Sequence, residues 1–125
     1  MSVTVDLGKL GATLQDFPFG YLVTVGDDYR AHAVSVVPTM GDGTVGVGAA
    51  GGRTLRNLAQ RDAVTLVCPP REPGGYTLIV DGHARPVTAP DGELRIVPGH
   101  AVLHRRAATP ATETTGCGQD CLPLD

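Results

Sequence analysis

Short apolar segments separated by glycine- and proline-containing turns are the feature that most restricts how this chain can fold. The 125 residues include 17 glycines and 10 prolines. Proline lacks an amide hydrogen and glycine accepts turn dihedral angles, so both residues tend to end regular elements. The segments between these turns are short and rich in valine, a β-branched residue typical of strands. The pattern predicts several short strands that close into a barrel or a sandwich.

Seven segments have this turn-bounded character: residues 19–25, 31–37, 44–50, 63–68, 76–88, 93–97 and 100–104. Asp42-Gly43 is a hairpin signal before the third of them. Asp6, a good helix cap, is followed by leucines that are spaced as on one face of a helix, which predicts a first short helix. A second helix is expected over residues 53–61. We therefore expect a mainly β fold of about six or seven strands with one or two short helices.

Composition and charge limit the number of domains and exclude several classes of protein. Hydrophobic residues make up 42% of the chain, enough for one core, and the net charge is −3 without a run of like charges. A nucleic-acid-binding domain would present a basic surface, and a membrane helix would need about 20 apolar residues. Because the start of the chain lacks the pattern of a secretory signal, we predict a cytoplasmic protein that engages neither nucleic acid nor membrane.

The composition shifts to alanine, threonine, proline and glycine near residue 107. We therefore predict one domain over residues 1–106 and a flexible tail over residues 107–125. The tail carries Cys117 and Cys121 as C-x-x-x-C, which a disulfide, a metal or redox chemistry would each suit, although spare thiols are the simpler interpretation. Cys68 falls on a predicted core strand and is expected to be a small buried hydrophobe.

The segment TVGVGAA at residues 44–50 alternates in an unusual way. Successive side chains of a strand face opposite sides, so Val45, Val47 and Ala49 would share one face while Gly46 and Gly48 leave the other nearly bare. Glycine within a strand often marks the close approach of a ligand or of another backbone. Two interpretations therefore remain open, a flat ligand lying on the strand or tight packing by a neighbouring element.

A possible anion site follows at the string Gly51-Gly52-Arg53-Thr54. If a helix begins here, its first amide hydrogens lack partners within the helix and its positive dipole end favours a negative charge. Arg53 and the hydroxyl of Thr54 would add to such a site. The string matches neither a P-loop nor a dinucleotide fingerprint, so the alternative is a simple turn with a solvated arginine.

These segments, taken in order, resemble the pyridoxamine 5′-phosphate oxidase-like split β-barrel family. The resemblance runs from about residue 17 to residue 105 and includes AHAVSVV, the GDG hairpin, TVGVGAA, GGRT, LRNLAQR and YTLIVDGHARPV. It implies a split β-barrel that binds FMN, or the deazaflavin F420, at the interface of a homodimer. A few members of the family bind haem or have no established cofactor.

The resemblance also implies site residues. The phosphate-binding basic pair of the family falls on Arg53 and Thr54, where the second position is commonly lysine, and a family arginine falls on His32. Contacts to the edge of the flavin ring fall on two runs, and a polar contact from the partner subunit falls near Thr77. The two runs comprise Ala33, Val34, Ser35 and Val36, and then Val47, Gly48 and Ala49.

No catalytic constellation of side chains stands out, which fits an enzyme whose cofactor carries the chemistry. The first hypothesis is an oxidoreductase that exchanges a hydride with a small-molecule substrate. The alternatives are a binding or storage protein without redox activity and a haem-binding member, for which His83, His100 or His104 would be the axial candidates. His100 and His104 would lie about 13 Å apart on a strand, too far to share one metal, so no metal site is predicted.

Overall fold

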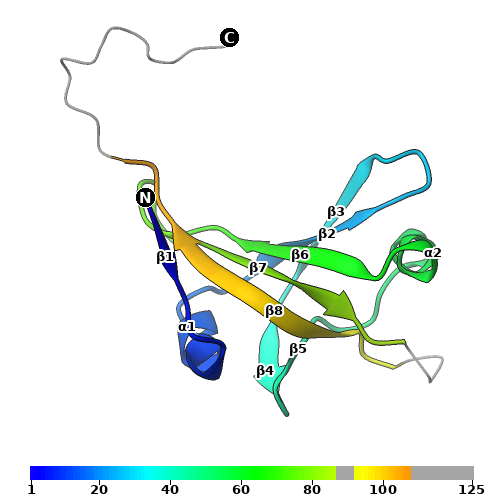
Figure 1. Ribbon diagram of the computed structural model, residues 1–125, viewed down its shortest axis with the longest axis horizontal. Helices are drawn as coiled ribbons and strands as arrows, with labels where there is room; N and C mark the ends of the chain where they lie inside the picture. Colours follow the sequence, from blue (N-terminus) through cyan, green and yellow to red (C-terminus); the bar gives the residue numbers. More distant parts are fainter. Residues whose placement is uncertain (87–91, 108–125) are drawn as a thin grey trace, which may run out of the picture.

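The computed structural model describes residues 1–86 and 92–107, and this part of the chain forms one curled antiparallel sheet with two short helices (Figure 1). The predicted tail, with Cys117 and Cys121, lies outside the described residues apart from Ala107. The eight described strands are β1 (Ser2–Thr4), β2 (Gly20–Val25), β3 (Ala31–Val36), β4 (Thr39–Gly41), β5 (Thr44–Gly46), β6 (Ala63–Cys68), β7 (Thr77–Ala84) and β8 (Arg95–His104). The helices are α1 (Leu10–Leu14), which follows the 3₁₀ turn Leu7–Lys9, and α2 (Gly52–Gln60).

The strands follow one another across the sheet in the order β3-β2-β6-β7-β8-β5-β4. β8 pairs with β7 along one edge, and its other edge pairs with β5 near the start and with β1 near the end. The two outer strands of the order, β3 and β4, are joined in sequence through only Val37 and Pro38. The sheet therefore curls back toward itself without closing (Figure 1), which confirms the predicted mainly β, split-barrel class.

Three details differ from the sequence-based prediction. The predicted strands 93–97 and 100–104 form the single strand β8, because a β-bulge opposite Asp81 and Gly82 accommodates Pro98. The strand predicted over 44–50 ends at Gly46, and Gly48 has a φ of +83°. The strands β1 and β4 have three residues each, too few for an alternating pattern to reveal them.

The core lies on the inner face of the curled sheet. Leu10 and Leu14 of α1 contribute to it, as expected from their helical spacing. The most buried core side chains, each with at most 1% of its surface exposed, are Leu10, Leu22, Val45, Leu66, Cys68, Leu78, Val80, Leu94, Ile96 and Ala101. A leucine or valine buried to this degree stabilises the fold by about 1.5–3 kcal/mol, so this cluster fixes the curvature of the sheet.

Two polar contacts anchor α2 to the end of β2. The buried side chain of Asn57 donates a hydrogen bond of 3.0 Å from Nδ2 to Oγ1 of Thr24. Arg61, the residue after the helix, donates from Nη1 to the carbonyl oxygen of Gly26 at 3.4 Å. One contact comes from the second half of the helix and the other from the residue just after it, so the C-terminal end of α2 is fixed against β2.

Cys68 is fully buried at the end of β6, which confirms its predicted role as a small core hydrophobe. Removal from water disfavours the thiolate, so burial raises the pKa of its thiol from 9.0 to about 11. The thiol is therefore neutral at physiological pH and a poor nucleophile.

We expect the free energy of unfolding to fall as the pH rises from about 9 to about 11. In this window the unfolded chain releases the Cys68 proton while the folded chain retains it, so unfolding becomes more favourable, by up to about 3 kcal/mol at the upper limit. Urea unfolding across this range measures the effect, and Cys68→Ala is the control because it lacks the titrating thiol. Parallel pH dependences for the two proteins would contradict the prediction.

Candidate functional site

A cavity of about 360 Å³ lies between β3, the segment that follows β5, and the start of α2. Its lining residues are Leu22, His32, Val34, Ser35, Val36, Val47, Ala49, Ala50, Gly51, Gly52, Arg53, Thr54 and Leu94. The fold thus brings together most of the residues that the sequence predicted for a cofactor site. Three predicted residues do not line it: Ala33 is exposed on β3, Gly48 is exposed in the turn after β5, and Thr77 lies on β7.

The cavity combines an apolar floor with a polar end. Leu22, Val47 and Leu94 are buried core residues whose side chains also face the cavity, and Val34 and Val36 of β3 pack beside them. His32 and Ser35 add polar groups from β3, and Arg53 stands at the start of α2. A small number of polar groups set around an apolar surface is the usual composition of a small-molecule site.

The first turn of α2 leaves backbone donors available at the polar end. The helix has Gly51 as its N-cap, without a side-chain cap, and its first backbone hydrogen bond runs from the amide of Leu55 to the carbonyl oxygen of Gly51 at 3.0 Å. The amides of Gly52, Arg53 and Thr54 precede that bond and have no acceptor within the helix. This confirms the predicted helix start and gives the cavity the positive end of a helix dipole.

Thr54 is the unusual residue of this turn. Its side chain is 2% exposed, lines the cavity, and forms no hydrogen bond in the part of the chain that the structure describes. Burying a hydroxyl without a partner costs about 1–3 kcal/mol. A buried donor that faces a cavity without a protein acceptor marks the point where a ligand acceptor would fit.

Two guanidinium groups stand near the same turn. Arg53 is an exposed lining residue. Arg56, one turn later, folds back so that its Nη1 lies 3.3 Å from where a Cβ of Gly52 would stand. Since cations are unfavourable beside the positive end of a helix dipole, a bound anion would relieve both groups.

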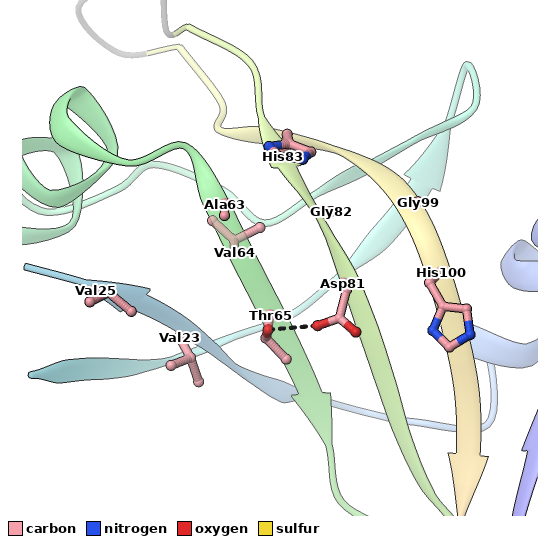
Figure 2. A pocket seen from close by; sticks show the side chains of 10 residues that line it. All are labelled: Val23, Val25, Ala63, Val64, Thr65, Asp81, Gly82, His83, Gly99 and His100. Carbon is pink, nitrogen blue, oxygen red and sulfur yellow. Dashed lines mark hydrogen bonds between the residues drawn. The ribbon is translucent and has the colours of Figure 1, made fainter. Parts of the chain in front are cut away.

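A second hollow lies on the outer face of the sheet (Figure 2). Valines of β2 form one side of it, and His83 and His100 project from β7 and β8 (Figure 2). Nδ1 of His83 hydrogen-bonds with Oδ1 of Asp62 at 3.0 Å, and the Thr65 hydroxyl donates to Asp81 at 2.8 Å.

His100 and His104 both lie on β8, as predicted. Within residues 1–86 and 92–107, no three metal-ligating side chains form a cluster.

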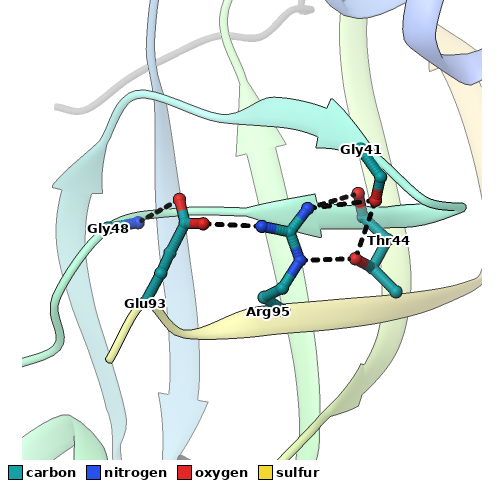
Figure 3. Close-up of polar contacts among 5 residues, drawn as sticks. All are labelled: Gly41, Thr44, Gly48, Glu93 and Arg95. Carbon is teal, nitrogen blue, oxygen red and sulfur yellow. Dashed lines mark hydrogen bonds and ion pairs between the residues drawn. The ribbon is translucent and has the colours of Figure 1, made fainter. Parts of the chain in front are cut away.

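Figure 3 shows a polar network that ties the β4–β5 hairpin to β8. The Arg95 side chain, on β8, donates from Nε to Oγ1 of Thr44 at 2.6 Å and from Nη2 to the carbonyl oxygen of Gly41 at 3.0 Å. Its Nη1 donates to Oε1 of Glu93 at 2.6 Å, and Oε2 of Glu93 accepts from the amide of Gly48 at 3.4 Å. The network therefore fixes the turn that leads from β5 into the cavity wall.

The network also bears on the two interpretations of the glycine-rich segment, through its contact with Gly46. A Cβ on Gly46 would meet the end of the flexible Glu93 side chain, which would have to shift to make room for it. Within residues 44–50, the residues that line the cavity are Val47, Ala49 and Ala50, so both sets of the alternation contribute to it. Packing by a neighbouring side chain therefore accounts for Gly46 itself, and a ligand on this segment stays a prediction.

Two relatives share nearly the whole length of the chain, and both are uncharacterized proteins, one of Mycobacterium bovis and one of Mycobacterium tuberculosis. Each is 46% identical over 132 aligned positions, which span 94% of this chain and 93% of the relative. The chain belongs to one family with these mycobacterial proteins. No family model matches the chain.

Solved structures identify the fold. A proposed pyridoxamine 5′-phosphate oxidase of Listeria innocua superposes with a TM-score of 0.61 at 17% identity, over 78% of this chain and 96% of that one. The FAD-binding protein of Mycobacterium smegmatis gives 0.62 at 19% identity, over 85% and 100% of the two chains. The chain folds as a pyridoxamine 5′-phosphate oxidase-like split barrel. The haem storage protein of Vibrio cholerae shares this fold, with a TM-score of 0.59 at 14% identity over 78% and 93%.

Sequence reasoning missed two residues that shape this split barrel, Glu93 and Arg95. Their spacing of two residues in a predicted strand places both side chains on one face, and opposite charges at that spacing were the available signal. Their partners Gly41, Thr44 and Gly48 lie about 45–54 residues away in sequence, which the sequence could not specify. None of the described helices is long and apolar enough to span a bilayer.

We expect Arg95→Met to destabilise the protein by about 2–3 kcal/mol, because it removes charge-assisted hydrogen bonds and leaves the Gly41 carbonyl and the Glu93 carboxylate without this partner. Urea unfolding measures the loss, and amide exchange should accelerate around residues 41–48. The matched control is Arg30→Met, which removes an exposed pair with Asp28 at 3.8 Å and should cost under about 0.5 kcal/mol. Equal effects of the two substitutions would contradict the prediction.

Proposed function

We propose that the chain is a homodimeric flavin- or deazaflavin-binding oxidoreductase, with FMN as the cofactor and F420 as the alternative. The observation that carries the proposal is the cavity in which an apolar floor meets the uncapped start of α2, the guanidinium of Arg53 and the unpartnered hydroxyl of Thr54. A flavin or deazaflavin has the matching chemistry, a flat ring system joined to a phosphate. The neighbouring FAD-binding protein of the same fold supports this reading.

In this proposal the polar end holds the phosphate. The amides of the first turn of α2 and the Thr54 hydroxyl donate hydrogen bonds to phosphate oxygens, and Arg53 pairs with the charge. The ring lies on the apolar floor between β3 and the segment after β5. Its contacts would come from the lining residues His32, Val34, Ser35, Val36, Val47 and Ala49; the predicted contacts Ala33 and Gly48 do not line the cavity.

The cofactor, when bound, supplies hydride exchange with a small-molecule substrate, so the protein needs no acid–base constellation of its own. The side chains of this chain bind the phosphate, fix the plane of the ring and exclude water from one of its sides. Leu22, Val47 and Leu94 do the last, because they are buried core residues that also line the cavity.

The outer face of the sheet supports the proposed homodimer. Solvated faces of antiparallel sheets are usually polar, yet the outward side chains of β2 are Tyr21, Val23 and Val25. Thr77 occupies the outward set of β7, because its neighbour Leu78 is fully buried. A second copy packed on this face would cover the valines and also Thr77, the residue for which the resemblance implies a contact across the dimer.

Optical titration of the purified protein with FMN, F420 and haem tests the proposed function. We expect FMN or F420 to bind, and Arg53→Ala to weaken that binding by tenfold or more, about 1.4 kcal/mol, because one charged contact to the phosphate is lost. The control is Arg71→Gln, an arginine that bonds to the carbonyl of Asp16 away from the cavity. Haem binding alone would favour the haem-binding alternative, and no binding of any of the three would favour a cofactor-free homologue.

Light scattering tests the dimer. We expect the wild type to be a dimer and Val23→Lys to shift it toward the monomer, because a charge would be buried in the proposed interface. Ala12→Lys, which adds the same charge at an exposed position of α1, should leave the dimer intact. A monomeric wild type, or dimers of equal stability for both variants, would exclude this face as the interface.

A further inference from the structure

We infer that Arg56 is a second phosphate-binding residue, whose guanidinium supplies the positive charge that Thr54 lacks. The inference rests on the proposed function, because the phosphate is that of the bound FMN or F420. Arg56 is not among the residues that line the cavity, so the inference adds a residue to the proposed site. It is carried by the position of the Arg56 side chain over Gly52 and by its lack of a partner among the described residues.

The helix itself directs Arg56 toward the phosphate end. Residues four apart lie on the same face of a helix, and helical side chains tilt toward the N-terminus. Arg56 follows Gly52, the first residue of α2, by four positions, so its side chain runs back along the helix to the first turn. Nη1 of Arg56 accordingly lies 3.3 Å from the place where a Cβ of Gly52 would stand.

Gly52 leaves the room that the guanidinium occupies. Its backbone is not in the left-handed region, so the conformation does not require glycine, and glycine is a poor helix former. Beyond the adjacent residues and the helix backbone, Arg56 is the one described residue that a Cβ here would approach within 4 Å. Because Gly52 also lines the cavity, its missing side chain leaves Arg56 beside the opening that the first turn of α2 faces.

The Arg56 guanidinium forms no ion pair and no hydrogen bond within residues 1–86 and 92–107, and the same holds for Arg53. Both side chains are therefore cations without a countercharge, at the end of a helix where a positive charge is unfavourable. The hydroxyl of Thr54, which is 2% exposed, also lacks a partner in this part of the chain. One bound anion would satisfy these three side chains together.

The charge of a phosphate monoester is balanced only when Arg56 is counted. Such a group carries about −1.5 to −2 at neutral pH. Arg53 has the one fixed charge among the described lining residues, and the start of α2 adds about half a positive charge. The resemblance implies a lysine at position 54 for the second full charge. Here that charge stands two residues further along the helix, on Arg56.

Arg56→Gln tests the role of this charge, in a fluorescence titration of the purified protein with FMN and with riboflavin, which has the same ring without a phosphate. We expect the FMN affinity to fall by about fivefold, the effect of one exposed charged contact, and the riboflavin affinity to stay unchanged. Arg71→Gln, which changes an arginine away from the cavity, should alter neither. The melting temperature of the ligand-free Arg56→Gln protein should not fall, because a cation is removed from the positive end of α2.

A charge restored at position 54 should rescue this loss. In the Arg56→Gln background, Thr54→Lys is expected to return the FMN affinity to within about twofold of the wild type, because an ammonium group again pairs with the phosphate. Thr54→Gln in the same background is the matched control, since it lengthens the side chain without adding a charge, and it should not rescue. Melting temperatures establish whether both double variants are folded, and the single variant decides the question if they are not.

The outcomes separate this inference from the proposed function. An unchanged FMN affinity for Arg56→Gln, an equal loss for FMN and riboflavin, or an equal rescue by both double variants would overturn the role of Arg56 and leave the function in place. If the wild type binds F420 and not FMN, the same variants are titrated with F420, and the rescue decides. If the wild type binds neither, the proposed function fails and this inference fails with it.

Discussion

The pairing of β8 with three other strands is the constraint on which the rest of the fold depends. β8 joins β7 on one edge and both β5 and β1 on the other, so it links the N-terminus, the glycine-rich hairpin and the main sheet. The residue just before it, Leu94, exchanges backbone hydrogen bonds with Val47 and Gly48 at 3.0 and 2.9 Å. The backbone pairing therefore continues past the start of β8 into the segment that forms one wall of the cavity. The β-bulge at Gly82 lets β8 run as one long strand that pairs with β7 on one edge and with β5 and β1 on the other.

The helix beside the cavity has a fixed C-terminal end and an N-terminal turn with unsatisfied groups. Asn57 and Arg61 satisfy hydrogen-bonding groups of β2 and of the turn after it, so the C-terminal half of α2 is fixed. The N-terminal turn has no side-chain cap, its amides face the cavity, and Thr54 is buried without a partner. Binding sites commonly concentrate such unsatisfied groups while the surrounding structure supplies the stability, and here the two regions lie within one helix of nine residues.

The sequence predicted the parts of the fold that local pattern determines. Valine-rich segments and Gly-Asp turns indicated β2, β3 and β6, and Gly51-Gly52-Arg53 indicated the start of α2, because strand and helix periods are visible over a few residues. The burial of Thr54 was not predictable, because it depends on how the helix rotates against β2. The contact between Glu93 and Gly46 was equally hidden, because it joins residues that only the β5–β8 pairing brings together.

Thr54 also illustrates why the loss of a charge need not mean the loss of a site. A lysine at this position would carry an ammonium group at the end of a four-carbon stem, and any part of its charge removed from water would need an accompanying anion. A threonine hydroxyl at the same place costs about 1–3 kcal/mol when it lacks a partner. Under the proposed function, the threonine therefore gives up the electrostatic contribution of an ammonium group but can still donate one hydrogen bond to a phosphate oxygen.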